Sequence, residues 1–188
     1  MQQQEQFLSW FAGFLDGEGC FSIVLAKQRT ANDFLAVKPQ IRVGLKNTSN
    51  ETSLISYIQS NIGAGKIYYS NKNKENGVVY WQTTKLSEAI EVTKKVLPFL
   101  ILKKKRAENF LRALEIWVNT RQADTGRRYH GLRLRTKEEV LELVKIATSL
   151  NSGRQTKRYR DYKGYDYWKS LINIWYSENR LTGFKGKN

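Results

Sequence analysis

The chain contains almost none of the residues that build disulfides, zinc sites or histidine-based catalysis. Among its 188 residues there is one cysteine, Cys20, and one histidine, His130. A lone cysteine cannot form an internal disulfide, so we expect an intracellular protein, cytoplasmic or organellar. Zinc fingers and histidine-dependent hydrolytic motifs are excluded because their ligands and bases are missing. Any hydrolytic chemistry would depend on carboxylates, lysines and a divalent metal.

Acidic residues and long apolar runs are also scarce. The chain has 17 Asp and Glu against 32 Lys and Arg, which gives a formal net charge of +15. So large an excess indicates a polyanionic partner, most often nucleic acid. The apolar run near the N-terminus is too short and too soon acidic for a signal peptide or a membrane span. We therefore expect neither a secretion signal nor a membrane partner.

A short apolar helix that stops at an acidic turn is expected around residues 11–19, FAGFLDGEG. Gly13 and Gly17 lie four residues apart, so they share a helix face and would let a second backbone come close. Asp16 and Glu18 fall at the negative end of the helix dipole, where carboxylates are unfavourable unless a cation lies nearby. A metal ion is one candidate for that cation. A capped helix end with two solvated acids is the alternative.

The segment 37–46 has the clearest alternation in the chain. One parity is apolar and predicts a row facing a core, whereas the other predicts polar side chains on an open sheet face. The second row consists of Lys38, Gln40, Arg42, Gly44 and Lys46. Lys, Gln and Arg are the side chains that pair with guanine, adenine and phosphate, which favours a DNA-facing surface. An ordinary solvated sheet face is the alternative.

A second polar row is expected on a hairpin formed by residues 66–70 and 78–84, which follows an amphipathic helix ending at residues 63–65. We expect this row to continue the first across the sheet. Its members are Lys66, Tyr68, Ser70, Tyr80 and Gln82. Lys27 and Arg29, near the end of an earlier strand, and Lys72, in the hairpin loop, extend the candidate DNA-binding surface.

The expected order of elements is helix, two strands, helix, two strands, helix. Its last helix is predicted to start at Ser87, to carry Leu86, Ile90 and Leu97 on its apolar face, and to be interrupted by Pro98. Four cations at 103–106 then lead into a further helix. Taken alone, these cations would equally suit a solvated patch or a nuclear-import signal.

A basic helical extension is expected at residues 121–188, continuous with a core at residues 1–120. A capping box at residues 136–139 opens one helix, and an aromatic helix near residues 165–176 packs through Trp168, Leu171 and Trp175. Between them lies a segment in which cations alternate with tyrosines, a composition that suits phosphate contact. The expected phosphate-contacting residues are Arg154, Lys157, Arg158 and Arg160.

The nonamer FAGFLDGEG resembles the signature of the LAGLIDADG homing endonucleases. It keeps the family's residues at Ala12, Gly13, Asp16 and Gly19, and it has Gly17 and Glu18 for the family's Ala and second Asp. Later landmarks at residues 62–65 and 98–103 keep the family's spacing. The resemblance covers about residues 8–118 and implies an α+β fold. This fold is an αββαββα half-saddle with an antiparallel DNA-binding sheet, to which the helical basic C-terminal extension is added.

The resemblance also implies roles for single residues. Glu18 would bind a divalent metal through its carboxylate and Gly17 through its carbonyl, while Asp16 would stabilise the turn. Asn47 and Lys103 would join Glu18 as catalytic residues, Asn47 by ordering solvent beside the metal and Lys103 by assisting the attacking water or the developing charge. The metal is expected to be Mg²⁺, with Mn²⁺ as a substitute and Ca²⁺ binding without supporting cleavage. One signature per chain implies a homodimer whose signature helices meet at Phe11, Ala12, Gly13 and Gly17.

Three functions remain open from the sequence. The first is a site-specific double-strand DNA endonuclease of the intron- or intein-homing type, with a long, nearly palindromic target and short 3′ overhangs. It is favoured because Glu18, Asn47 and Lys103 occur together. The second is a non-cleaving binder on the same scaffold, either a transcription regulator or an RNA maturase, and only the maturase would have RNA as a partner. The third is a basic structural or ribosome-associated protein that uses the charge without metal chemistry.

Overall fold

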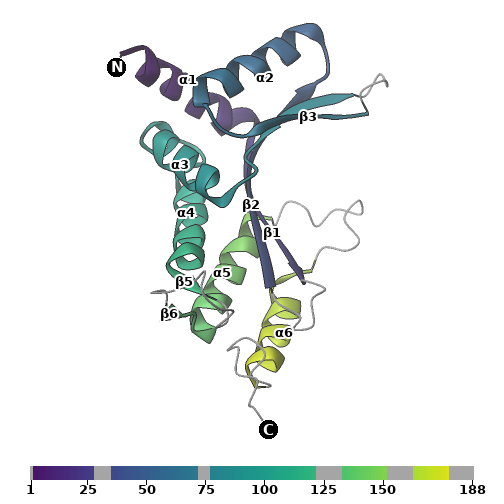
Figure 1. Ribbon diagram of the computed structural model, residues 1–188, viewed down its shortest axis with the longest axis vertical. Helices are drawn as coiled ribbons and strands as arrows, with labels where there is room; N and C mark the ends of the chain where they lie inside the picture. The colour runs from purple at the N-terminus through teal and green to yellow at the C-terminus, as the bar shows by residue number, and fades with distance from the viewer. Residues whose placement is uncertain (1, 28–34, 72–76, 122–132, 152–162, 178–188) are drawn as a thin grey trace. The chain divides into compact units, whose positions relative to one another are not determined.

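The computed structural model describes residues 2–27, 35–71, 77–121, 133–151 and 163–177 (Figure 1). The chain divides into two compact units, one of Met1–Ser22 with Pro39–Leu111 and the other of Ile23–Lys38 with Arg112–Asn188. Strands β1 (Gly19–Lys27) and β2 (Leu35–Lys46) and helix α4 (Lys104–Asn119) give residues to both units. The sequence was expected to divide into a core at residues 1–120 and an extension at residues 121–188, whereas these two units exchange segments of the chain and share no single boundary.

The elements of the first unit follow the expected αββαββα order. After α1 (Gln2–Glu18), β1 and β2 come α2 (Ser49–Ile62), β3 (Lys66–Ser70), β4 (Val78–Gln82), α3 (Leu86–Val96), the 3₁₀ turn η1 (Leu97–Phe99) and α4. The strand order in the sheet is β1-β2-β4-β3, and β4 runs antiparallel to both β2 and β3. The prediction of an α+β fold with an antiparallel sheet is confirmed.

The core of this unit lies between one face of α1, one face of α2 and the apolar side of the sheet. Helices α1 and α2 lie side by side (Figure 1). The ring of Phe11 on α1 meets Trp81 on β4 edge-on at 5.6 Å between centroids. The fully or almost fully buried side chains include Phe7, Phe11, Ala12, Leu15, Ile41, Val43, Ile55, Ile58, Ile62, Val79 and Trp81. The alternation expected for β2 is thus present over residues 40–44, where Ile41 and Val43 are buried and their neighbours are half-buried.

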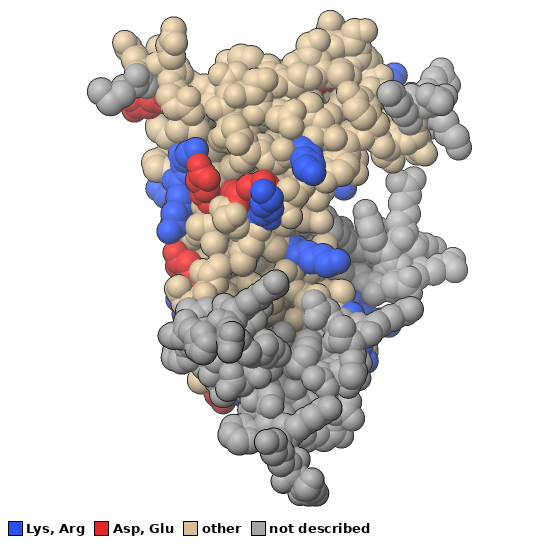
Figure 2. Space-filling view, viewed as in Figure 1, with Lys and Arg blue, Asp and Glu red and all other residues tan. Residues whose placement is uncertain are grey.

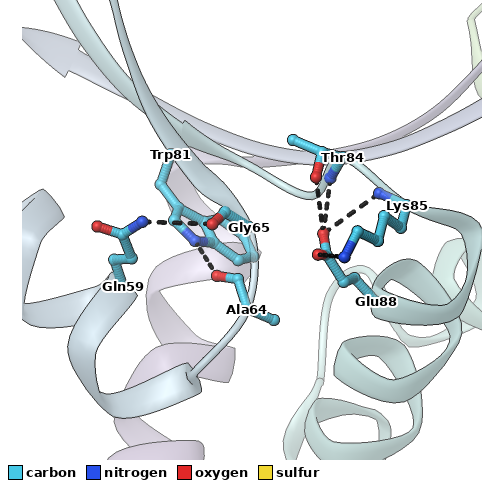
Figure 3. A network of polar contacts seen from close by, with 7 residues as sticks. All are labelled: Gln59, Ala64, Gly65, Trp81, Thr84, Lys85 and Glu88. Carbon is cyan, nitrogen blue, oxygen red and sulfur yellow. Dashed lines mark hydrogen bonds and ion pairs between the residues drawn. The ribbon is translucent and has the colours of Figure 1, made fainter.

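The turn between α2 and β3 is hydrogen-bonded both to α2 and to strand β4 (Figure 3). The indole N–H of Trp81 donates to the carbonyl of Ala64 at 2.8 Å, and the side-chain amide of Gln59 donates to the carbonyl of Gly65 at 3.3 Å. Gly65 has a φ of +79°, and a Cβ there would lie 2.5 Å from the Trp81 indole nitrogen. Both the backbone conformation and the close approach of Trp81 therefore require glycine at this position.

The start of α3 is fixed by an acid rather than by the serine expected there. The carboxylate of Glu88 accepts from the backbone N–H of Thr84 at 2.9 Å and of Lys85 at 3.2 Å, and also from the Thr84 hydroxyl (Figure 3). The helix begins at Leu86. Its buried residues are Ala89, Val92, Thr93 and Val96, whereas Leu86, Ile90 and Leu97 are only half-buried. The predicted apolar face was wrong, although Pro98 ends the helix as expected.

The second unit contains α5 (Lys137–Leu150), α6 (Tyr165–Ser177) and a short parallel pair, β5 (Thr120–Arg121) with β6 (Arg133–Leu134). The predicted capping box is confirmed, because Thr136 Oγ1 accepts from the Glu139 amide and the Glu139 carboxylate accepts from the Thr136 amide. Trp168 and Trp175 are buried as expected, but Ile172 takes the buried position expected of Leu171.

Asn151, which follows α5, is hydrogen-bonded to the part of β1 that belongs to this unit. The side-chain amide of Asn151 donates to the carbonyl of Ile23 at 2.6 Å in a buried position. This contact accounts for part of the grouping of residues 23–38 with the C-terminal helices. None of the helices in the described part of the chain is long and apolar enough to cross a membrane.

Candidate active site and nucleic-acid interface

Asp16, in the last turn of α1, is held by three backbone amides that lie 85 or more residues away in the sequence. One carboxylate oxygen accepts from the N–H of Ile101 at 2.7 Å and of Leu102 at 3.1 Å, and the other accepts from the N–H of Lys103 at 2.8 Å. These residues follow η1, so Asp16 ties the end of α1 to the segment that leads into α4. The expected role of Asp16 in stabilising the turn agrees with these contacts.

These contacts also keep Asp16 ionised. Burial on its own would raise the pKa of this carboxyl, but the hydrogen bonds from the amides of Ile101, Lys103 and Leu102, with the positive charge of Lys103, outweigh it. The pKa of Asp16 therefore lies below its ordinary value of 3.8. Hydrogen bonds to the charged form favour that form, so the carboxylate accepts all three amides at neutral pH.

The ammonium group of Lys103 closes the C-terminal end of α1. It donates to the carbonyl oxygens of Leu15 at 2.8 Å, Gly17 at 3.1 Å and Gly19 at 2.9 Å. The last carbonyls of a helix have no partner within the helix and form its negative end, so a cation is stabilised there. An ammonium has three N–H donors, and all three are used. The cation that the sequence led us to expect at this helix end is thus supplied in part by the chain itself.

Glu18, by contrast, projects from the helix end. Both Glu18 and Gly17 are exposed, and in the described part of the chain no hydrogen bond or ion pair engages the Glu18 carboxylate. Two carboxylates two residues apart therefore have different surroundings. Asp16 is engaged by the chain, and Glu18 is open to a ligand from outside it.

Asn47 lies directly after β2 and is half-buried. Its backbone N–H donates to the carbonyl of Gly77 at 2.8 Å, and its side-chain oxygen accepts from the Thr52 hydroxyl on α2 at 3.3 Å. Strands β1 and β2 are neighbours in the sheet. Only seven residues separate them in the sequence, and a parallel pair needs a connection of about a dozen or more, so the two strands run antiparallel. The end of β2, with Asn47, accordingly lies towards the start of β1 and the acidic turn. Lys103 meets that turn by direct hydrogen bonds, whereas those described for Asn47 lead to α2 and to Gly77.

The glycines of the signature differ in what surrounds them. A Cβ on Gly19 would come within 2.5 Å of the Leu15 side chain, so the chain itself requires glycine there. Gly13 and Gly17 are exposed, and a Cβ on either would meet no described residue within 4 Å. Their small size is therefore not needed for packing within the described part of the chain.

Phe11 and Ala12, which were expected at a contact between two chains, are 0% exposed within the single chain. Phe11 packs against Trp81, and both residues belong to the protein's own core. The helix face that remains accessible carries Gly13 and Gly17, together with Trp10, which is 41% exposed and stacks on Phe14. The exposed part of this helix turn is therefore this face, and not Phe11 and Ala12.

The two polar rows of the sheet form one continuous surface, as expected. Across strands β2, β4 and β3 the register aligns Arg42 with Gln82 and Lys66, Gly44 with Tyr80 and Tyr68, and Lys46 with Val78 and Ser70. Residues opposite one another in an antiparallel pair point to the same face. Gln40 precedes this region on the same parity of β2 and is half-buried. No acidic residue belongs to these three aligned rows.

Elsewhere on the described surface the positive charge is interrupted. On the face drawn in Figure 2, Lys and Arg side chains lie directly beside Asp and Glu side chains. Exposed ion pairs include Lys95 with Glu91, Lys105 with Glu108 and Arg112 with Glu142. The aligned rows of the sheet differ from these surfaces because cations and amides occur there without acids.

Several predicted contact residues lie elsewhere. Lys27 and Lys38 are exposed and belong to the second unit, where the Lys27 ammonium lies 6.0 Å from the centre of the Tyr167 ring. The remaining predicted contacts lie outside the described residues, namely Arg29, Lys72, Arg154, Lys157, Arg158 and Arg160.

The sequence did not point to Ile101 and Leu102, whose amides bind Asp16. Their side chains are 83% and 80% exposed, which is unusual for large apolar residues. A backbone amide is present in almost every residue, so the sequence does not mark these two as ligands of Asp16. The one unusual feature in the sequence is that two apolar residues stand directly before the four cations at 103–106. The same segment supplies Lys103, which was found through its spacing from Pro98.

Fold and site together define a class of protein, in which an antiparallel sheet with an acid-free polar face accompanies a helix that ends at an acidic turn. A family model described as LAGLIDADG endonuclease matches residues 11–112. The chain therefore belongs to the LAGLIDADG endonuclease family, and the predicted membership is confirmed. A comparison with curated protein sequences gives no match.

Solved structures of homing endonucleases share the fold. The homing endonuclease I-CvuI in complex with a DNA target in the presence of Mg is 16% identical, with a TM-score of 0.70 over 93% of this chain and 98% of that chain. The archaeal intron-encoded homing endonuclease I-Vdi141I complexed with DNA is 21% identical, with a TM-score of 0.67 over 91% and 97%. The LAGLIDADG meganuclease I-CpaMI bound to uncleaved DNA is 22% identical, with a TM-score of 0.61, and this chain covers 52% of its length.

Proposed function

We propose that this protein is a site-specific double-strand DNA endonuclease of the intron- or intein-homing type. One observation carries the proposal: of the two acids in the turn, Asp16 is bound by three backbone amides and Glu18 is left exposed beside the helix-end carbonyls. Carboxylate and carbonyl oxygens are the ligands that hard divalent cations prefer. Membership of the LAGLIDADG endonuclease family supports the same activity.

The residues that would hold the metal are Glu18, through its carboxylate, and Gly17, through its carbonyl. This donor set fits a divalent cation, because both residues are exposed and the Gly17 carbonyl, which accepts one hydrogen bond from the ammonium of Lys103, has a second lone pair. In the described parts of the chain no group of three or more His, Cys, Asp or Glu is gathered for a metal. Further ligands would come from DNA, water or a second chain. Mg²⁺ is the proposed ion, with Mn²⁺ as a substitute and Ca²⁺ as a binder that does not support cleavage; when bound, it neutralises phosphate charge and activates water.

Lys103 and Asn47 complete the proposed catalytic set with Glu18. Lys103 holds a positive charge against the Gly17 carbonyl, one residue from Glu18, where it would stabilise negative charge that develops on the phosphodiester. Asn47 would order solvent from the end of β2. The chain's single histidine, His130, lies outside the described residues, and this set does not depend on it.

We further propose that two copies of the chain form one enzyme. Gly13 and Gly17 leave an open strip on α1 that none of the described residues fills, and Trp10 lies on the same exposed part of the helix. The highly exposed side chains of Ile101 and Leu102 lie next to the amides that bind Asp16, so they too are available to a second copy.

A twofold dimer implies a target with matching symmetry. Each sheet would place its aligned polar rows in a major groove, and the two half-sites would form a long, nearly palindromic sequence. Each Glu18 would direct cleavage of one strand across the minor groove, which would leave short 3′ overhangs. The phosphate contacts predicted for Arg154, Lys157, Arg158 and Arg160 remain part of this proposal.

Cleavage of a plasmid library with randomised inserts tests the function. The wild-type protein should cut a subset of plasmids with Mg²⁺, and Glu18→Gln should reduce the rate on the selected site at least about 100-fold. Glu5→Gln is the matched control, because Glu5 is also an exposed acid on α1. Equal cutting by wild type and Glu18→Gln would remove the catalytic assignment. Sequence-specific binding by the wild type without cutting in Mg²⁺ or Mn²⁺ would favour the non-cleaving binder.

A further inference from the structure

Three side chains from three strands form a layered stack on the polar face of the sheet. The central guanidinium carbon of Arg42 on β2 lies 3.6 Å from the ring centre of Tyr80 on β4. The Tyr80 ring in turn lies 5.4 Å from that of Tyr68 on β3, with 19° between the ring planes. The stack therefore runs across the sheet from Arg42 through Tyr80 to Tyr68.

The register of the sheet explains why the stack forms. Tyr80 lies opposite Gly44 on one side and Tyr68 on the other, while Arg42 lies opposite Gln82. Tyr80 has no side chain facing it from β2, because its partner there, Gly44, has none. Arg42 therefore reaches diagonally over the ring of Tyr80, a distance that long side chains span in an antiparallel pair.

The stack holds the face of the guanidinium and leaves its edge available. In the described part of the chain no carboxylate pairs with Arg42, which is half-buried, as is Tyr80. A guanidinium carries five N–H donors in its own plane, so a ring against its face does not engage them. Less side-chain freedom is lost on binding when a group is already held in place.

We propose that Arg42 reads one guanine in each half of the DNA target and that Tyr80, supported by Tyr68, is the residue that positions it. The in-plane donors of arginine match the O6 and N7 acceptors of guanine, the commonest specific contact in the major groove. Arg42 would therefore specify a base pair, and Tyr80 would contribute to specificity by holding the guanidinium of Arg42 in position. The proposal rests on the proposed function as a DNA-binding enzyme.

The main alternative is that the stacked Arg42 contacts a phosphate. A phosphate contact would strengthen binding to all sequences and would add to the salt dependence of the affinity. A base contact instead creates a preference at one base pair of the half-site. The two are separated by measuring binding to every single-base variant of the selected target, in Ca²⁺ and at several salt concentrations.

Two tyrosine variants test the positioning role. Tyr80→Phe keeps the ring and should retain the wild-type preference for guanine. Tyr80→Leu should lower the preference for guanine over adenine at one base pair per half-site at least about 5-fold, with little change in affinity for unrelated DNA or in its salt dependence. A uniform loss of affinity at every base pair, or a Tyr80→Phe variant as weak as Tyr80→Leu, would overturn the positioning role.

Arg42→Gln tests the base contact independently of the tyrosines and of their packing. Glutamine pairs with adenine, so this variant should shift the preference at the same base pair from guanine towards adenine. An unchanged preference at that base pair would overturn the proposal. If the wild-type protein binds no double-stranded DNA with sequence preference, the proposed function itself fails, and that outcome is visible before any variant is compared. Melting temperatures of all variants show that they fold.

Discussion

The two sides of the C-terminal end of α1 differ in where their polar groups find partners. On one side Asp16 binds three amides, Lys103 binds three carbonyls, and Gly19 lies against Leu15. On the other side Glu18 is exposed, and no residue that the structure describes lies within 4 Å of a Cβ on Gly13 or Gly17. The difference shows that residues of one signature lie in two kinds of surroundings. The closed side is bound within the chain, and the open side is exposed, as the proposed contacts with a metal and a second copy require.

The largest expected effect comes from filling the open side. Gly13→Leu should raise the dissociation constant of the dimer at least about 100-fold, because a large side chain would lie between two closely packed helices. The stability of the single chain should not fall, because leucine has a higher helix propensity than glycine, by roughly half a kcal/mol or more. Sedimentation equilibrium measures the first quantity and urea denaturation the second.

A matched control for this variant lies on the same helix. Gln4 is exposed and lies nine residues before Gly13, so it projects about half a turn around the helix from that position. Gln4→Leu should leave the dimer unchanged, and Gly13→Ala should weaken it less than Gly13→Leu. A wild-type chain that sediments as a monomer with and without DNA would contradict the dimer.

On the closed side, Asp16→Ala should destabilise the fold. Three backbone amides would lose a charged acceptor, and such hydrogen bonds contribute more than neutral ones, so the free energy of unfolding should fall by about 2–4 kcal/mol. Glu18→Ala, two residues away, should change it by less than about 0.5 kcal/mol. Urea denaturation of the two variants measures both. If Asp16→Ala and Glu18→Ala lower the free energy of unfolding equally, the hydrogen bonds of Asp16 do not stabilise the fold.

The sequence predicts the local patterns of this fold well. Alternation in β2, the capping box at Thr136 and the glycine-rich end of α2 each depend on side chains or backbone preferences within a few residues. The start of α3 was predicted to within one residue, because Ser87 and Glu88 both suit a helix start and Glu88 caps the helix. Its buried face was harder to predict, because that face is set by what the helix packs against. The αββαββα order follows from such local patterns taken in sequence.

The contacts of the candidate site depend on residues far apart and could not be predicted in the same way. The amides that bind Asp16 belong to residues 101–103, and every residue except proline has such an amide, so no sequence pattern marks them. Lys103 and Asn47 were identified through family spacing rather than by their own chemistry. The burial of Phe11 and Ala12 likewise depends on the packing of Trp81 and the other core residues against α1.

A smaller effect is expected for Lys103→Met. The variant would leave the carbonyls of Leu15, Gly17 and Gly19 without their shared donor, and the free energy of unfolding should fall by about 1–3 kcal/mol. Lys105→Met is the matched control, because Lys105 is exposed and its ion pair with Glu108 is of the surface kind that contributes little. If both variants are equally stable, the ammonium of Lys103 does not support the helix end, and a purely catalytic role would be favoured.

The smallest effect concerns the acid sensitivity of the closed side. The pKa of Asp16 is lowered in the folded chain, so its stabilising contribution is complete above the ordinary value of 3.8 and is lost as the pH falls through the folded pKa. Asp16→Asn does not titrate and should reduce the slope of unfolding free energy against pH below about pH 4, by at most about 1.4 kcal/mol per pH unit. Urea denaturation from pH 3 to pH 7, with Glu5→Gln as the control, measures both slopes. Identical slopes in wild type and Asp16→Asn would show that the three amides do not favour the ionised carboxylate.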